Sequence, residues 1–154
     1  WQRPSWRRTS ATRSWWPDMA SVTQIRKAIA ARCGTITGLN AYPTAPGQAV
    51  VPAAIVLPGP IAYDATMRRG SDDFTFTLRL LASQASSDAG QDALDAYVSS
   101  SGASSIKSVV DGDLDGVVDF ARVASMDSYG EIEWNGVLYL GADFTVEVTA
   151  SGEV

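Results

Sequence analysis

The chain has 154 residues, 45% of them hydrophobic, with a formal net charge of −5 and no histidine. The lack of histidine excludes the commonest general base, the histidine-dependent catalytic triads and most zinc sites. No apolar run approaches the roughly 20 residues that span a bilayer, and the single cysteine, Cys33, excludes an internal disulfide. We expect Cys33 to be a small buried apolar residue.

Residues 1–18 differ in composition from the rest of the chain. They contain four of the five tryptophans and have a net charge of +3, whereas residues 19–154 have 8 basic and 16 acidic residues, a net of −8. We therefore expect residues 19–154 to form a single domain. Residues 1–18 are then either an N-terminal arm that packs on a neighbouring subunit or an upstream extension. As an arm, they would bury tryptophans in that contact, namely Trp6, Trp15 and Trp16.

The first predicted element is a helix over residues 22–33. Ser21 and Gln24 fit a capping box, in which each side chain accepts from the other residue's backbone N–H. Apolar residues then recur on one helical face, and Gly34 ends the helix.

Glycine and proline punctuate residues 34–52, which predicts a long connection that could contribute to an interface. Apolar runs then predict short strands over 53–57 and 61–66. A charged turn is expected over 68–73. Its Arg68 and Arg69, close to two aspartates, form either an ordinary charged loop or an interface element that sets partner orientation.

Residues 73–81 are the clearest predicted strand. Large apolar residues alternate there with Thr75, Thr77 and Arg79. This period of two places one face on the core and the other toward water or a partner. We therefore expect Thr75, Thr77 and Arg79 to be candidate interface residues.

A second helix is predicted over residues 88–99. A short third helix follows, capped by Ser104 or Ser105, with its apolar residues facing inward. Helices and strands are therefore segregated along the chain, which favours the α+β class: a mixed, mostly antiparallel sheet with two to three helices packed on it.

The last third of the chain predicts antiparallel sheet. One strand over 117–126 is expected to break at 127–130, and Asn135-Gly136 predicts a two-residue hairpin turn between 131–134 and 137–140. Gly141 predicts a bulge or bend. Half-buried alternation then predicts a final strand over 144–149.

Trp134, one residue before the predicted turn, has two interpretations. A tryptophan at a hairpin tip can anchor a protein–protein contact, or it can pack on the sheet beside Ile132. Glu131 and Glu133 share the other side of this segment, and we expect them to be solvated carboxylates rather than a catalytic pair.

Residues 111–116 match the start of the calcium loop D-x-D-x-D-G, with Asp111, Asp113 and Asp115 as candidate ligands. The twelfth loop position, which requires a bidentate glutamate, is Arg122, and its positive charge opposes metal binding. A solvated acidic turn is therefore the preferred interpretation, with a calcium site as the weaker alternative.

Several segments taken together, in order and spacing, resemble the tail terminator proteins of long-tailed bacteriophages, particularly those of actinobacterial hosts. The resemblance covers about residues 20–150. It is carried by VTQIRKAIAARC, Gly38-Leu39-Asn40-Ala41-Tyr42-Pro43, the strand ending at Leu81, AGQDALDAYV, Ser104-Ser105-Ile106-Lys107-Ser108, Tyr129-Gly130 and Asn135-Gly136-Val137-Leu138-Tyr139-Leu140-Gly141-Ala142.

The resemblance implies a non-enzymatic virion protein that is assembled in the host cytoplasm, with no cofactor and no membrane partner. Such proteins form a six-fold ring that caps the tail tube and joins it to the head-closure or connector protein. DNA would pass through the lumen without sequence-specific binding, and an acidic lining would suit that passage by repulsion. Two alternatives stay open: another neck protein, such as a head-closure or stopper component, and a small calcium-binding module.

Overall fold

A six-stranded mixed sheet forms the centre of the chain in a computed structural model that describes residues 21–63, 71–84 and 88–151. Five strands lie side by side in the order β1 (Asn40–Tyr42), β2 (Ala53–Leu57), β4 (Ser71–Gln84), β6 (Val137–Ser151) and β5 (Phe120–Trp134). The short β3 (Ile61–Ala62) pairs with β4 beyond the end of β2. Only β1 and β2 are parallel among these pairs.

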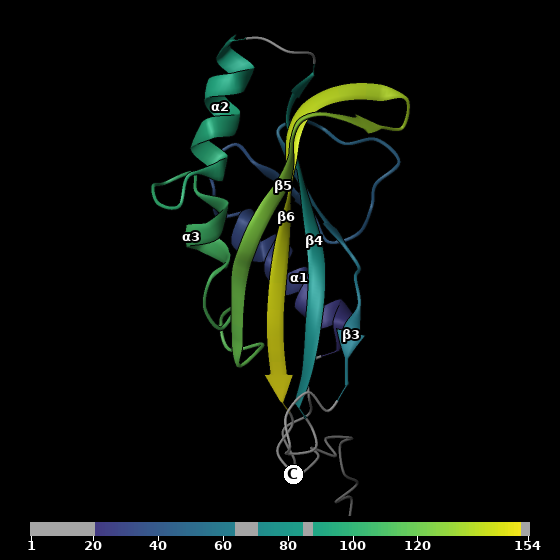
Figure 1. Cartoon of the computed structure of the whole chain (residues 1–154), viewed down its shortest axis with the longest axis vertical. Coiled ribbons are helices and arrows are strands. Elements are labelled where there is room, and N and C mark those ends of the chain that lie inside the picture. Colours follow the sequence, from purple (N-terminus) through teal and green to yellow (C-terminus); the bar gives the residue numbers. More distant parts are fainter. Residues whose placement is uncertain (1–20, 64–70, 85–87, 152–154) are drawn as a thin grey trace, which may run out of the picture.

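Three helices, α1 (Val22–Cys33), α2 (Asp88–Val98) and α3 (Ile106–Val110), lie on one side of the sheet. Figure 1 shows α1 crossing behind the strands, with α2 and α3 along the β5 side. The predicted α+β class, with a mostly antiparallel sheet and helices packed on it, is therefore confirmed.

The main core lies between this helical layer and the sheet. Phe74, Phe76, Leu78 and Leu80 of β4 are at most 4% exposed, and they belong to the same apolar cluster as the inward residues of the helices. Each large side chain of this kind stabilises the fold by roughly 1.5–3 kcal/mol when it leaves water. The predicted alternation along β4 therefore identifies its buried side correctly.

Local signals place α1 as predicted. The Ser21 hydroxyl accepts from the Gln24 N–H at 3.2 Å, and the Gln24 side chain accepts from the Ser21 N–H at 2.8 Å. Gly34 follows as the C-cap. These contacts satisfy backbone donors that have no partner inside the helix, which explains why the helix begins at Val22.

The connection over 34–52 contains a strand that the sequence does not reveal. Asn40–Tyr42 is too short to show a period, and it becomes β1 only because it aligns with β2. Upstream of β4, the predicted strand over 61–66 is a strand at Ile61 and Ala62 but not at Tyr63, and 64–66 lie outside the described residues.

Three strands are longer than predicted. β4 begins at Ser71, inside the expected charged turn, and ends at Gln84. β5 is one strand, and the predicted break over 127–130 is instead a bulge at which Ser128 and Gly130 have positive φ. β6 likewise continues through Gly141. In each case pairing with a long neighbouring strand supplies backbone partners that local sequence cannot show.

The β5–β6 hairpin forms a second apolar cluster on the face of the sheet opposite the helices. Asn135 and Gly136 have φ values of 51° and 81°, which confirms the predicted two-residue turn. Figure 1 shows the hairpin end curving over the sheet. The buried members of this cluster are Ile55, Leu81, Ile132 and Tyr139, and the half-buried residues packed on it are Tyr42, Ala49, Val51, Leu57, Trp134 and Val137.

Candidate assembly surface

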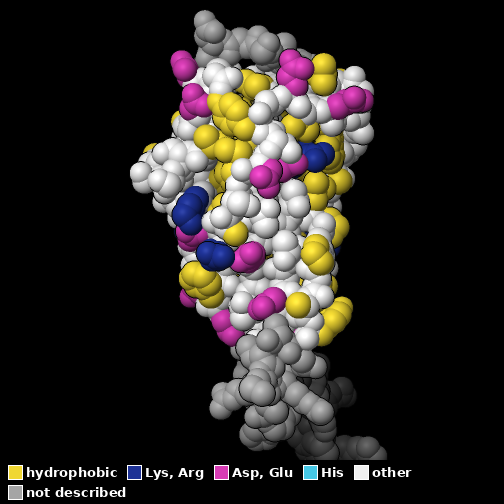
Figure 2. All heavy atoms as spheres, viewed as in Figure 1, with side chains coloured by type: hydrophobic (Ala, Val, Ile, Leu, Met, Phe, Trp, Pro, Cys, Tyr) yellow, Lys and Arg dark blue, Asp and Glu magenta, His cyan; other side chains and the backbone are white. Residues whose placement is uncertain are grey.

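Below this hairpin cluster, none of the described helices covers the face of the sheet turned away from α1. We call this part of the sheet the open face. Its side chains form rows across three strands because the registers align them: Thr75, Glu147 and Arg122 in one row, and Thr77, Thr145 and Ser125 in the next. Figure 2 views this face and shows a largely white surface of polar groups and backbone, with acidic and basic side chains distributed over it.

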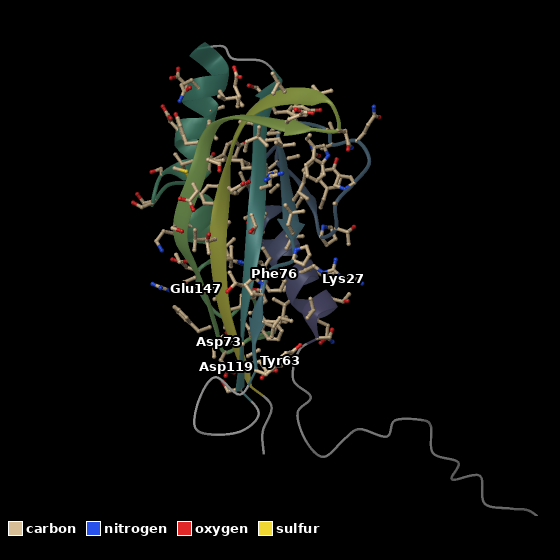
Figure 3. All side chains as sticks on the ribbon, turned by 45° about the vertical axis from the view of Figure 1, so that its right-hand side comes forward. Lys27, Tyr63, Asp73, Phe76, Asp119 and Glu147 are labelled. Carbon is tan, nitrogen blue, oxygen red and sulfur yellow. The ribbon has the colours of Figure 1, made fainter. Side chains whose placement is uncertain are left out.

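Figure 3 separates the two faces of the sheet. Phe76 points toward α1, whereas Glu147, on the neighbouring strand, points away from it. The fractional exposures agree, since Phe76 is 2% exposed and Glu147 belongs to the exposed class. The open face is therefore a polar surface on a sheet whose opposite face is packed against α1.

Polar contacts join neighbouring strands across the open face. Arg122 pairs with Glu147 at 3.0 Å, and the Thr149 hydroxyl donates to Asp73 at 2.8 Å. Exposed ion pairs contribute only about 0–1 kcal/mol. Their effect here is to hold side chains in defined positions along the surface.

Arg79 is engaged inside the chain. Its Nε and Nη2 donate to the two carboxylate oxygens of Asp143 at 2.8 and 3.0 Å, a bidentate arrangement. The hydrogen bond to Asp143 raises the pKa of Arg79, and partial burial opposes that rise. The guanidinium also lies over the ring of Trp134, 5.9 Å from its centroid. Arg79 therefore connects the open face to the hairpin cluster.

Trp134 packs on the sheet with Ile132 in the hairpin cluster, as one of its two interpretations proposes. Its indole Nε1 is buried and has no hydrogen-bond partner among the described residues. Buried tryptophan N–H groups usually find an acceptor. A contact of Trp134 with a partner protein stays a prediction.

The connection between β1 and β2 is held against the hairpin. Asn135 Nδ2 donates to the carbonyl of Gly47. Within the connection, Asn40 Nδ2 donates to the carbonyl of Val50 at 3.0 Å, and the Val50 N–H donates to the Tyr42 hydroxyl at 3.1 Å. The expected long connection therefore has a defined shape, and its Val50 side chain is 65% exposed.

The acidic motif over 111–116 protects the edge of the sheet. Asp111 accepts from the Val123 N–H at 2.8 Å and pairs with Lys107 at 2.8 Å, while Lys107 also donates to the Val123 carbonyl at 3.2 Å. These contacts occupy the outward backbone groups of β5, an edge strand, at this position.

The three candidate calcium ligands do not converge. Asp111 is engaged with β5, Asp115 pairs with Arg32 at 3.5 Å, and the Asp113 side chain is exposed. Within the described ranges, no group of three His, Cys, Asp or Glu residues is placed to hold a metal ion. The geometry therefore favours a structural turn over a calcium loop.

Four of the predicted interface residues, Thr75, Thr77, Arg79 and Trp134, lie on the same side of the sheet. The others fall outside the described residues, namely Trp6, Trp15, Trp16, Arg68 and Arg69. The sequence did not indicate Asp143 or Arg122 as residues of this surface, because only strand pairing brings them beside Arg79 and Glu147. The alternation of apolar and polar residues over 144–149 did predict which side of β6 faces away from the core.

A scan of protein-family models gives no match to this chain, and neither does a search of curated proteins. Among the described helices, none has the length and apolar character needed to cross a bilayer.

Proposed function

We propose that the chain is a structural virion protein, the tail terminator of a long-tailed bacteriophage. In this proposal, copies of the chain assemble into a ring that docks on the last ring of the tail tube. Docking covers the surface on which the tube grows and replaces it with one that binds the head-closure or connector protein. The chain acts through its shape and surface and catalyses no reaction.

The observation that carries the proposal is the open face on a sheet whose other side is fully packed. Three long strands, β4, β6 and β5, present it as a continuous polar surface. Interfaces that form during assembly are about as polar as ordinary protein surface, so a polar face is suited to that use. A ring also requires a heterologous contact whose rotation closes, and a two-layer domain offers two different surfaces for it.

Loss of the chain from its phage tests the proposal directly. We expect negative-stain images to show overlong tails that are not attached to heads, because nothing then stops tube growth. Tails of normal length would instead indicate a stopper or head-closure component, the neighbouring alternative. Finished, infectious particles would rule out both assignments.

A surface substitution tests the role of the open face. Thr77→Arg places a long charged side chain in the middle of this face, and it should prevent assembly while the purified protein keeps its circular dichroism spectrum. Ser100→Arg is the matched control, because Ser100 is exposed in the turn after α2, which packs on the helical side of the sheet. Normal tails with Thr77→Arg would show that the open face is not an assembly surface.

A further inference from the structure

The outer side of the β5–β6 hairpin is a second surface without a partner. Leu138 is 52% exposed and lies across from Glu133, and Glu131 shares the same side of β5. Tyr129, 42% exposed, donates its hydroxyl to Asp95 of α2, which joins the helix to this surface. We call Asp95, Tyr129, Glu131, Glu133 and Leu138 the hairpin-end patch.

No cation balances this patch within the described part of the chain. The described lysines and arginines lie elsewhere. Arg26, Lys27 and Arg32 are on α1 and Lys107 is on α3, whereas Arg79 and Arg122 are on the side of the sheet opposite the patch. Glu131 and Glu133 are roughly 7 Å apart, two residues along a strand, and neither is in an ion pair with a described residue. In Figure 2 the end of the molecule that carries the hairpin shows acidic and apolar groups without basic ones.

The outer edge of β5 is covered by other residues near its start and less so toward the hairpin. Near its start, Gly112 pairs with Ala121, and Lys107 and Asp111 hold Val123. Toward the hairpin end, Tyr129 of β5 donates its hydroxyl to Asp95 of α2. Contacts from 107–112 thus protect one half of this edge, and among the described residues no strand pairs with the other half, beside the patch.

We propose that the hairpin-end patch binds residues 1–18 of a second copy of this chain. That segment has a net charge of +3 and four tryptophans, and the patch offers three carboxylates beside two exposed apolar side chains. Arginine and tryptophan are the residues most often found at the energetic centres of interfaces. The proposal gives the neighbouring-subunit contact of the arm a specific partner surface, and it rests on the self-assembly in the proposed function.

The position of α1 favours a second copy over the same chain. Figure 1 places the start of α1 at the end of the molecule away from the hairpin. The 14 residues of β4 span on the order of 45 Å, so an arm binding its own patch would have to run back along almost the whole molecule. A copy placed head-to-tail brings its patch close to Val22. Such contacts are heterologous and can close into a ring.

Photo-crosslinking of the full chain tests this contact. Leu138→p-benzoylphenylalanine, mixed with ¹⁵N-labelled chains that carry the native residue, should crosslink to residues 1–18 of the labelled chains. Crosslinks that join two parts of one unlabelled chain would overturn the second-copy assignment. Crosslinks to other segments, or none at all, would overturn the arm as the occupant.

Charge variants give an independent measurement. Glu131→Gln/Glu133→Gln should weaken self-association about five-fold in low salt, as expected for two exposed ion pairs. Asp113→Asn/Asp115→Asn removes the same net charge from the turn after α3, and it should change the self-association constant less than two-fold. Sedimentation velocity over a dilution series measures both. Equal weakening by the two double variants would contradict the proposed contact, as would a native chain that does not self-associate. Tails of normal length in phage that lack the gene would contradict only the proposed phage function.

Discussion

Single residues set how closely the two main strands approach. A β-carbon added to Gly141 would lie 2.0 Å from the carbonyl oxygen of Leu80 and 3.2 Å from Cδ1 of Ile132. Glycine therefore allows β6 to pass β4 at the point where the hairpin begins to curve. The irregularity predicted at Gly141 lies instead on the two neighbouring strands, between Leu81 and Ser83 of β4 and between Asp127 and Gly130 of β5.

Gly141→Ala should lower the free energy of unfolding by about 1–3 kcal/mol, the usual cost of forcing extra atoms into a packed site. Gly47→Ala is the control, because nothing lies within 4 Å of the added carbon there. Urea denaturation of both variants measures the difference. An unchanged midpoint for Gly141→Ala would mean that the strands separate without cost.

Cys33 illustrates how burial controls a single side chain. It is 0% exposed, and desolvation raises the pKa of its thiol from 9.0 to about 12, with a small opposing effect of Arg32. The thiol should therefore react with Ellman's reagent at pH 8 only when the chain is unfolded. A rapid stoichiometric reaction of the native protein would contradict its burial.

The same pKa shift predicts a pH dependence. Because the folded pKa is the higher one, stability is unaffected by this group below pH 9.0 and falls as pH rises toward about 12. The loss is about 1.4 kcal/mol per pH unit in that window. The difference in unfolding free energy between the native chain and Cys33→Ala, measured at pH 8 and pH 10, should change by that amount. The same difference in unfolding free energy at both pH values would show that ionisation of Cys33 does not affect stability.

At the scale of elements, α3 depends on one buried hydroxyl. Ser105 is 0% exposed, accepts from the Ser108 N–H at 3.1 Å, and donates to the carbonyl of Ser99. It thus caps α3 and closes the turn after α2. The sequence left Ser104 and Ser105 as equal candidates, and only burial distinguishes them.

Ser105→Ala should cost about 1–2 kcal/mol, because it removes the N-cap of α3 and the hydrogen bond to the Ser99 carbonyl. Ser104→Ala, at the half-buried neighbouring position, should stay within about 0.5 kcal/mol of the native chain. Thermal unfolding followed by circular dichroism compares them. An equal loss of stability in both variants would show that Ser105 is not the residue that caps α3.

At the scale of the whole molecule, the acidic residues act through long-range contacts. Asp111 joins α3 to β5, and Asp115 joins the same turn to Arg32 of α1. A calcium site would have to break these pairs before it could collect three carboxylates. The fold therefore uses the motif to connect elements.

Calcium at 1 mM should consequently shift the melting temperature by less than about 1 °C. A site with a Kd of about 10 μM would add roughly 2.7 kcal/mol at that concentration, which corresponds to several degrees for a chain of this size. Differential scanning calorimetry with calcium, and with EDTA as control, measures the shift. A rise of several degrees that Asp113→Asn removes would restore the calcium alternative.

The sequence by itself determined those features whose partners are close along the chain. The capping box of α1, the Asn135-Gly136 turn and the alternation of β4 each depend on residues within a few positions of one another. Their hydrogen bonds and side-chain directions follow from local geometry. For this reason the class of fold, the buried side of β4 and the opposite, half-buried side with Thr75 and Thr77 could be predicted.

Only the tertiary structure decided the contacts that strand pairing creates. Arg79 and Asp143 are 64 positions apart, and β5 continues through Ser128 because β6 supplies its backbone partners. Register between distant strands depends on the packing of the whole core, so no local pattern contains it. The open face, the hairpin cluster and the protected edge at Val123 exist only after that register is set.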